Sequence, residues 1–95
     1  MKKYEIMFII KPDLTEDERK NLLTQIGDQV TKNNGTVGQS SIWAERKKIY
    51  FPIRKYREGT YYLLNFTLDA GHIDKIRQAY NLNENILRFL ISSLE

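Results

Sequence analysis

The stretch Tyr4-Glu5-Ile6-Met7-Phe8-Ile9-Ile10-Lys11-Pro12 decides how the chain begins to fold. Residues 4–10 are rich in β-branched and aromatic side chains, which favour a strand. Proline pushes the residue before it toward extended geometry and lacks a ladder donor, so this strand ends near Lys11. The chain therefore opens with a β-strand over residues 4–10.

A helix is predicted directly after this strand. Thr15 and Glu18 have the spacing of a capping box. Apolar residues then recur at helical spacing on one face, which predicts a helix over about residues 16–33. The pair Asn34-Gly35 is expected to close it with a left-handed cap.

The rest of the chain predicts three strands and one more helix. Residues 36–53 favour one long, bent strand, and residues 55–59 form the loop of a hairpin that returns as a strand over 60–68. A helix of about ten residues follows near 73–80. The last strand is predicted over 86–91, after an Asn-rich turn.

This β-α-β-β-α-β order predicts an α+β, ferredoxin-like sandwich, with a four-stranded antiparallel sheet and both helices on one face. We expect a single domain over residues 1–95 with no tail. In this topology the second and fourth strands are edges, and Pro52 agrees, because proline is tolerated at a sheet edge. The sheet face away from the helices stays open, and an exposed aromatic surface there would be a binding platform.

Composition limits the possible classes of protein. The 95 residues are 41% hydrophobic and 28% charged, which fits one small domain. The longest apolar run, residues 6–10, is far shorter than the roughly 20 residues of a membrane-spanning helix, so no membrane partner is expected. The chain has no cysteine, which removes disulfides and thiolate chemistry and suits an intracellular protein.

The residues give little basis for catalysis. His72 is the only histidine, and we expect it to be solvent-exposed, with no second metal ligand at a suitable spacing. The glycines are spread too widely for a phosphate cradle, and no Ser-His-Asp set can be built. We therefore expect no enzyme activity, no cofactor, no metal and no small-molecule substrate.

The basic residues are concentrated in one segment. The formal net charge is only +3, yet residues 40–60 hold six bases against two acids, a local net of +4. Tyrosines 50, 56, 61 and 62 are interleaved with these bases, and RNA-binding surfaces combine phosphate-pairing bases with stacking aromatics. Lysines at an edge strand also prevent aggregation, so a purely structural explanation stays open. The bases are Arg46, Lys47, Lys48, Arg54, Lys55 and Arg57.

Four motifs in order resemble the ribosomal protein S6 family over nearly the whole chain. They are Lys3-Tyr4-Glu5 with the apolar run to Pro12, Arg46-Lys47-Lys48-Ile49-Tyr50-Phe51-Pro52-Ile53, Gly59-Thr60-Tyr61-Tyr62, and Asn85-Ile86-Leu87-Arg88-Phe89. Two features differ from the family. Trp43-Ala44-Glu45 stands where its members usually have a glycine, and the polar tail of many members is missing.

The resemblance implies a structural, non-catalytic protein of the cytoplasmic ribosome. Its members contact the central domain of 16S rRNA in the small subunit and pair with ribosomal protein S18. Matching positions imply RNA or partner contacts for Lys2, Lys3, Tyr4, Lys47, Lys48 and Arg88. Charge clustering adds Arg46, Arg54, Lys55 and Arg57.

Two other functions fit the predicted fold. A regulatory module that binds a small ligand and dimerises through its sheet would explain the topology but not the basic segment. An acylphosphatase-like enzyme needs a glycine-rich phosphate loop with an arginine after the first strand, and residues 11–15 contain neither. We set the enzyme aside and keep the regulatory module as the alternative.

Overall fold

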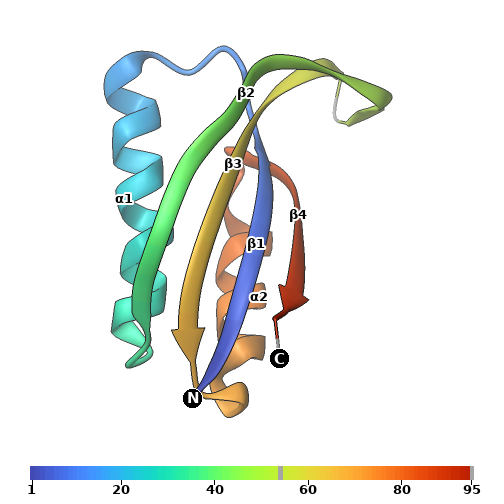
Figure 1. Cartoon of the computed structure of the whole chain (residues 1–95). Helices are drawn as coiled ribbons and strands as arrows, with labels where there is room; N and C mark the ends of the chain where they lie inside the picture. Colours follow the sequence, from blue (N-terminus) through green and yellow to red (C-terminus); the bar gives the residue numbers. More distant parts are fainter. Residues whose placement is uncertain (54, 95) are drawn as a thin grey trace.

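The fold is a four-stranded antiparallel sheet with two helices on one face, in the order β2-β3-β1-β4 (Figure 1). The computed structural model describes the backbone of residues 1–53 and 55–94 and the side chains of residues 1–49 and 55–94. Both the predicted topology and the edge positions of the second and fourth strands are confirmed. The elements are β1 (Lys2–Ile10), α1 (Glu16–Lys32), β2 (Thr36–Ile53), β3 (Tyr56–Leu68), the short 3₁₀ helix η1 (Ala70–His72), α2 (Ile73–Leu82) and β4 (Ile86–Ser93).

The capping box at the start of α1 is formed as predicted. The Thr15 N–H donates to Glu18 Oε1 at 2.9 Å, and the Glu18 N–H donates to Thr15 Oγ1 at 3.1 Å. The hydrogen bonds from the backbone and side chain of Thr15 hold the pKa of Glu18 below its usual value, because they favour the ionised carboxylate. This pair fixes where the helix begins.

The left-handed cap predicted at the end of α1 is confirmed, with Asn34 as the left-handed residue. Asn34 adopts the left-handed conformation, with φ of 66°, whereas Gly35 does not. A Cβ at Gly35 would lie 2.6 Å from the Thr67 carbonyl oxygen, so glycine is needed where the chain passes close to β3.

His72 is half-buried rather than solvent-exposed, and its Nδ1 lies 2.8 Å from the Asn33 carbonyl oxygen. It therefore ties the start of α2 to the end of α1.

The hydrophobic core fills the space between the sheet and both helices. Phe8, Tyr80 and Phe89 join β1, α2 and β4 through edge-to-face contacts, with ring centroids 5.0 Å apart for Phe8–Tyr80 and 5.8 Å for Tyr80–Phe89. The Tyr80 hydroxyl donates to the Ile26 carbonyl oxygen at 2.6 Å. Burial, with a smaller contribution from Tyr62, raises the pKa of Tyr80. One buried cluster thus fixes both helices against the same sheet face.

The hairpin between β2 and β3 is longer than expected. Residues 55–59 were predicted to form a loop, but β3 already begins at Tyr56, which pairs with Ile53. Lys55 turns the chain with φ of 79°. The loop prediction was wrong because three of its residues pair with β2, in the pairs Lys47↔Gly59, Lys48↔Glu58 and Ile53↔Tyr56. The hairpin therefore projects beyond the ends of the other two strands (Figure 1).

Candidate nucleic-acid interface

The basic segment of β2 contains a bulge. The register passes from Ala44↔Tyr61 to Lys47↔Gly59, so three steps on β2 match two on β3. Arg46, inside this irregularity, has φ of 49°. The structure therefore bends β2 at Trp43-Ala44-Glu45-Arg46, without a glycine.

Arg46 and Lys48 lie beside one acidic residue. Arg46 Nη1 is 3.7 Å from Glu58 Oε2, and Glu58 is the register partner of Lys48. The Lys47 ammonium group lies instead over the rings of Trp43 and Tyr61. This arrangement agrees with the separation of Lys47 from Arg46 and Lys48 that strand alternation predicts, although the bulge interrupts the regular period.

Lys47 lies over aromatic surface contributed by two strands. Its Nζ is 5.2 Å from the ring centroid of Trp43 and 5.2 Å from that of Tyr61. Trp43 is 62% exposed, so much of its indole stays free to contact another molecule. A cation held against an exposed indole combines phosphate pairing with base stacking in one place. Trp43 was missed as a site residue by the sequence reasoning, because its contact with Lys47 depends on the bulge.

The bases of the hairpin differ in how far they are already neutralised. Arg46 has its exposed ion pair with Glu58, and exposed pairs of this kind contribute little. Among the described residues, no ion pair involves Lys47, Lys48, Lys55 or Arg57, and all four are exposed. Their charge therefore remains available to a polyanion. The predicted site residue Arg54 lies outside the described residues.

Two of the predicted aromatic contacts lie in the core. Tyr4 is 7% exposed and stacks on Phe66 with ring centroids 5.5 Å apart. Tyr62 is also 7% exposed and lies against Phe8. Both rings lie on the helix side of the sheet, because Tyr4 and Tyr62 alternate in phase with the other buried residues of β1 and β3. Neither ring can serve as an open stacking surface.

The remaining predicted bases are dispersed along the sheet. Lys2 and Lys3 pair with Leu68 and Thr67, at the end of the sheet opposite the hairpin. Arg88 lies opposite Ile9, on the other side of β1 from β3. The structure thus groups the hairpin bases together and leaves Lys2, Lys3 and Arg88 outside that group.

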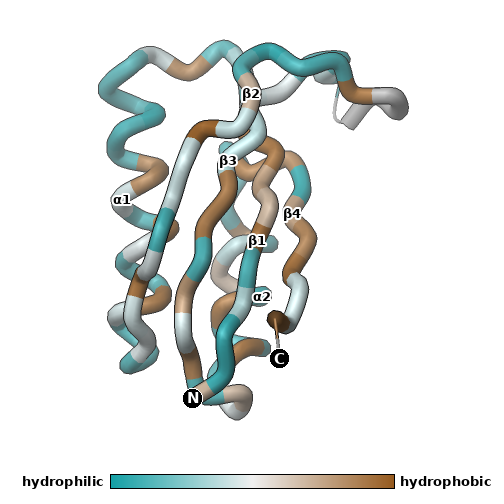
Figure 2. Tube along the Cα trace, in the orientation of Figure 1, coloured by the Kyte–Doolittle hydropathy of each residue, from teal (hydrophilic) through white to brown (hydrophobic). Residues whose placement is uncertain are grey.

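An apolar groove lies on the open face of the sheet. Its volume is about 220 Å³, and it runs between β1, β3 and β4. Leu90, at its border, is 67% exposed. In Figure 2 the middle of β4 is strongly hydrophobic, and Figure 1 shows no helix over this face. The groove is lined by Met7, Ile9, Tyr61, Arg88, Phe89 and Leu90.

A further base, which directly follows β1, contacts the hairpin. Lys11 Nζ lies 5.9 Å from the ring centroid of Tyr56, and the Tyr56 hydroxyl donates to Asp13 Oδ2 at 3.4 Å. The sequence reasoning missed Lys11, because only the folded chain brings it over Tyr56, close to the turn of the hairpin. These contacts steady the projecting segment.

The fold and these surfaces define a class of protein: a ferredoxin-like binding domain with a basic, aromatic hairpin and an open apolar sheet face. No helix in the described part of the chain has the length and apolar character to span a membrane. The family model described as Ribosomal protein S6 matches residues 3–93. The chain therefore belongs to the ribosomal protein S6 family, whose members are structural components of the small ribosomal subunit.

Relatives in sequence and structure agree with this assignment. The chain is 35% identical over 91 residues to small ribosomal subunit protein bS6 of Fusobacterium nucleatum, covering 96% of each chain. It is 37% identical over 94 residues to the protein of the same name from Lactobacillus acidophilus, covering 98% of this chain and 95% of that one. The crystal structure of 30S ribosomal protein S6 from Thermotoga maritima superposes with a TM-score of 0.88 at 26% identity, covering 97% of this chain and 86% of that one. These relatives bear names of ribosomal components, and none of the names indicates catalysis.

Proposed function

We propose that this chain binds the central domain of 16S rRNA together with ribosomal protein S18, as a structural protein of the small subunit in the cytoplasmic ribosome. The observation that carries the proposal is the placement of Lys47 over Trp43 and Tyr61 on a projecting hairpin. This arrangement presents a cation and exposed aromatic surface to the same ligand. Family membership supports the choice of ribosomal RNA as that ligand.

In this proposal, RNA and S18 bind to two different surfaces of the chain. The hairpin bases neutralise RNA phosphates, whereas the groove bordered by Leu90 takes an apolar surface of S18. The net charge of +3 is small for an RNA-binding protein. A handful of phosphate contacts binds RNA weakly at physiological salt, so S18 is expected to join first and complete the RNA site.

The experiment measures binding to a central-domain fragment of 16S rRNA, with and without S18, over a series of salt concentrations. We expect weak binding by this chain alone and tight binding by the pair. Tight, salt-insensitive binding by this chain alone would contradict the proposed division of work.

A double variant tests the hairpin directly. Lys47→Ala with Lys48→Ala removes two phosphate contacts, so the slope of log K against log salt should become shallower by about 1.4–1.8. The matched control is Lys20→Ala with Lys32→Ala, which removes two exposed bases from α1. An unchanged slope in the hairpin variant would remove Lys47 and Lys48 from the RNA interface.

The open apolar face also favours a second function, a regulatory module that dimerises through its sheet. Sedimentation at micromolar concentration distinguishes the two. A stable homodimer with no affinity for the 16S fragment, even with S18 present, would favour the regulatory module. A monomer that forms a complex with S18 supports the ribosomal function.

A further inference from the structure

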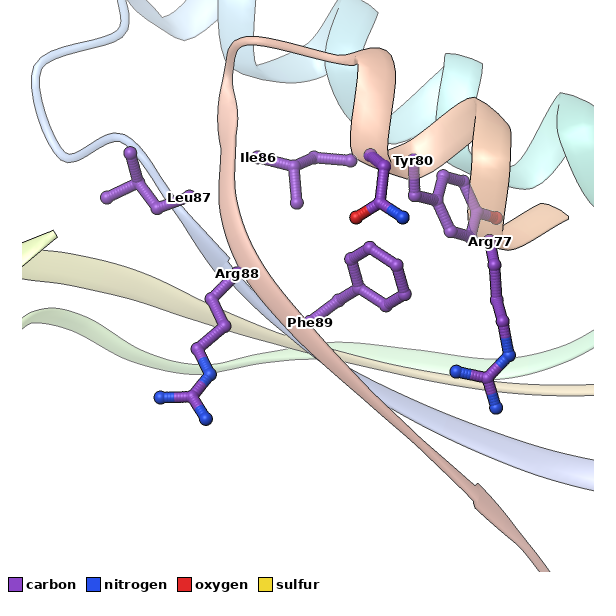
Figure 3. A pocket seen from close by; sticks show the side chains of 7 residues that line it. Arg77, Tyr80, Ile86, Leu87, Arg88 and Phe89 are labelled. Carbon is purple, nitrogen blue, oxygen red and sulfur yellow. The ribbon is translucent and has the colours of Figure 1, made fainter. Parts of the chain in front are cut away.

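A second groove lies at the free edge of β4, beside α2 (Figure 3). Its volume is about 300 Å³, within the range of small-ligand sites. The strand order puts it at the opposite edge of the sheet from β2, so it is separate from the hairpin. It adjoins the open-face groove proposed for S18, because Arg88 and Phe89 line both grooves. It is lined by Arg77, Tyr80, Asn81, Ile86, Leu87, Arg88 and Phe89.

Two arginines from different elements flank this groove. Arg77 comes from α2 and Arg88 from β4, and Figure 3 shows their guanidinium groups on either side of Phe89. Both side chains are exposed, and neither has an ion pair or hydrogen-bond partner within the described part of the chain. Each guanidinium therefore keeps its donors for a ligand. Two such donors flanking one groove favour an anion, because charge-assisted bonds from arginine match phosphate and carboxylate oxygens.

The wall between the arginines is aromatic and rigid. Phe89 is half-buried and is held in place by its edge-to-face contact with Tyr80. Tyr80 is itself fixed by its hydrogen bond to Ile26. Asn81 adds an exposed side-chain amide, which offers both donors and an acceptor. The groove thus combines anion binding, a stacking surface and a group able to read a base edge.

We propose that this groove binds one nucleotide of single-stranded RNA. Arg77 and Arg88 take the phosphates, the base stacks on Phe89, and the Asn81 amide contacts the edge of the base. A carboxylate on an acidic peptide would use the arginines but leave the aromatic ring and the amide without a role, so RNA fits the whole groove better. This inference rests on the proposed function for its choice of RNA, and it adds a contact at the opposite edge of the sheet.

The binding experiment is an NMR titration of the full chain with a short oligoadenylate. Inorganic phosphate and an oligoglutamate peptide of matched charge are titrated in parallel. We expect chemical-shift changes at Arg77, Asn81, Arg88 and Phe89, and tighter binding of oligoadenylate than of either probe. Oligoglutamate that binds as tightly as oligoadenylate would overturn the assignment to RNA.

Variants at the two ends of the groove test the individual roles. Arg77→Ala should weaken oligoadenylate binding about tenfold, since it removes a charge-assisted contact. Phe89→Leu keeps most of the apolar volume and should weaken binding at least fivefold through lost stacking. The matched control is Lys75→Ala, which removes an exposed base from the same helix outside the groove lining.

Phe89→Leu could also disturb packing, because Phe89 is half-buried. Arg77→Lys changes only an exposed side chain and gives a second test that does not depend on folding. It keeps the charge but loses the planar guanidinium, so its affinity should fall between wild type and Arg77→Ala. Equal affinity for Arg77→Ala and Lys75→Ala would overturn the proposal, as would shift changes confined to the hairpin.

The same proteins are then assembled with S18 and the 16S fragment, which separates this inference from the proposed function. If the wild-type chain joins the complex but oligoadenylate leaves the groove residues unperturbed, only the groove assignment fails. If the wild-type chain does not join the complex, the proposed function fails, and oligoadenylate shifts at Arg77 would still support nucleotide binding.

Discussion

Gly59 is the point where the hairpin meets the rest of the sheet, and Gly59→Ala tests how closely they approach. Gly59 is buried on β3, opposite Lys47. An added Cβ would lie 2.5 Å from Ile9 Cγ2, 3.3 Å from the Ile10 carbonyl oxygen and 3.4 Å from Ile49 Cδ1. Its φ is not positive, so the expected effect is steric and involves no backbone strain.

The magnitude follows from two opposing contributions. Overpacking a close contact costs about 1–3 kcal/mol, and a β-branched neighbour such as Ile9 has few rotamers with which to relieve it. Alanine recovers about 0.5–1 kcal/mol, because glycine is entropically unfavourable in a strand. The net free energy of unfolding should therefore fall by about 1–2 kcal/mol. In a domain of this size, the melting temperature should fall by roughly 5–15 °C.

Urea and thermal unfolding by circular dichroism measure this effect. Gly71→Ala is the matched control, because the nearest atom to its added Cβ is Asp69 Oδ1 at 3.9 Å. Ile9→Ala should cost less in the Gly59→Ala background than in the wild type, since it removes the clashing methyl group. If Gly59→Ala were as stable as wild type and Gly71→Ala, the close packing of the hairpin base would be refuted.

Three further predictions concern the core, the helix cap and the open face. Tyr80→Phe should cost about 1 kcal/mol by removing the hydrogen bond to Ile26. Because burial raises the pKa of Tyr80, the unfolded chain loses the proton first, so wild-type stability falls as pH rises above about 10. Over that pH range the free energy of unfolding should fall less steeply for Tyr80→Phe than for the wild type. Identical pH profiles for the two proteins would contradict this effect of burial. Thr15→Ala should cost about 1 kcal/mol through loss of the cap. The lowered pKa of Glu18 means that its contribution is present above the unfolded carboxyl pKa and is lost as pH falls through the folded value. In Thr15→Ala the pKa of Glu18, followed by NMR, should rise only in part, because the backbone N–H of residue 15 still donates to the carboxylate. An unmoved pKa would show that the Thr15 hydroxyl contributes nothing to it. Leu90→Glu should block the complex with S18 but change the free energy of unfolding by less than about 0.5 kcal/mol, since the side chain is 67% exposed. Undiminished affinity for S18 would place the partner elsewhere.

The topology could be predicted from sequence because its signals are local. Alternating apolar residues, the Thr15–Glu18 spacing and the proline after the first strand each act within a few residues of the chain. The order of elements then leaves few possible topologies. Crossovers are right-handed, and a proline within a strand is tolerated only at the edge of a sheet. For the same reason, the basic segment was correctly placed on an edge strand.

The candidate site depended on contacts between distant residues. Lys47 was visible in the sequence, but only the bulge and the register with β3 bring it over Trp43 and Tyr61. Tyr4 was assigned to the interface, yet strand pairing directs its ring into the core. The alternation of side chains along a strand can be predicted from sequence. Which of the two alternating sets faces the core depends on where the helices pack.

The sequence by itself therefore determined the order of elements, the positive hairpin and the family. Only the tertiary structure decided which aromatics remain exposed and that Arg77 and Arg88 flank one groove. The physical reason is range: propensities and caps act between neighbours in sequence, whereas a site is assembled by burial and strand register from residues far apart in the chain.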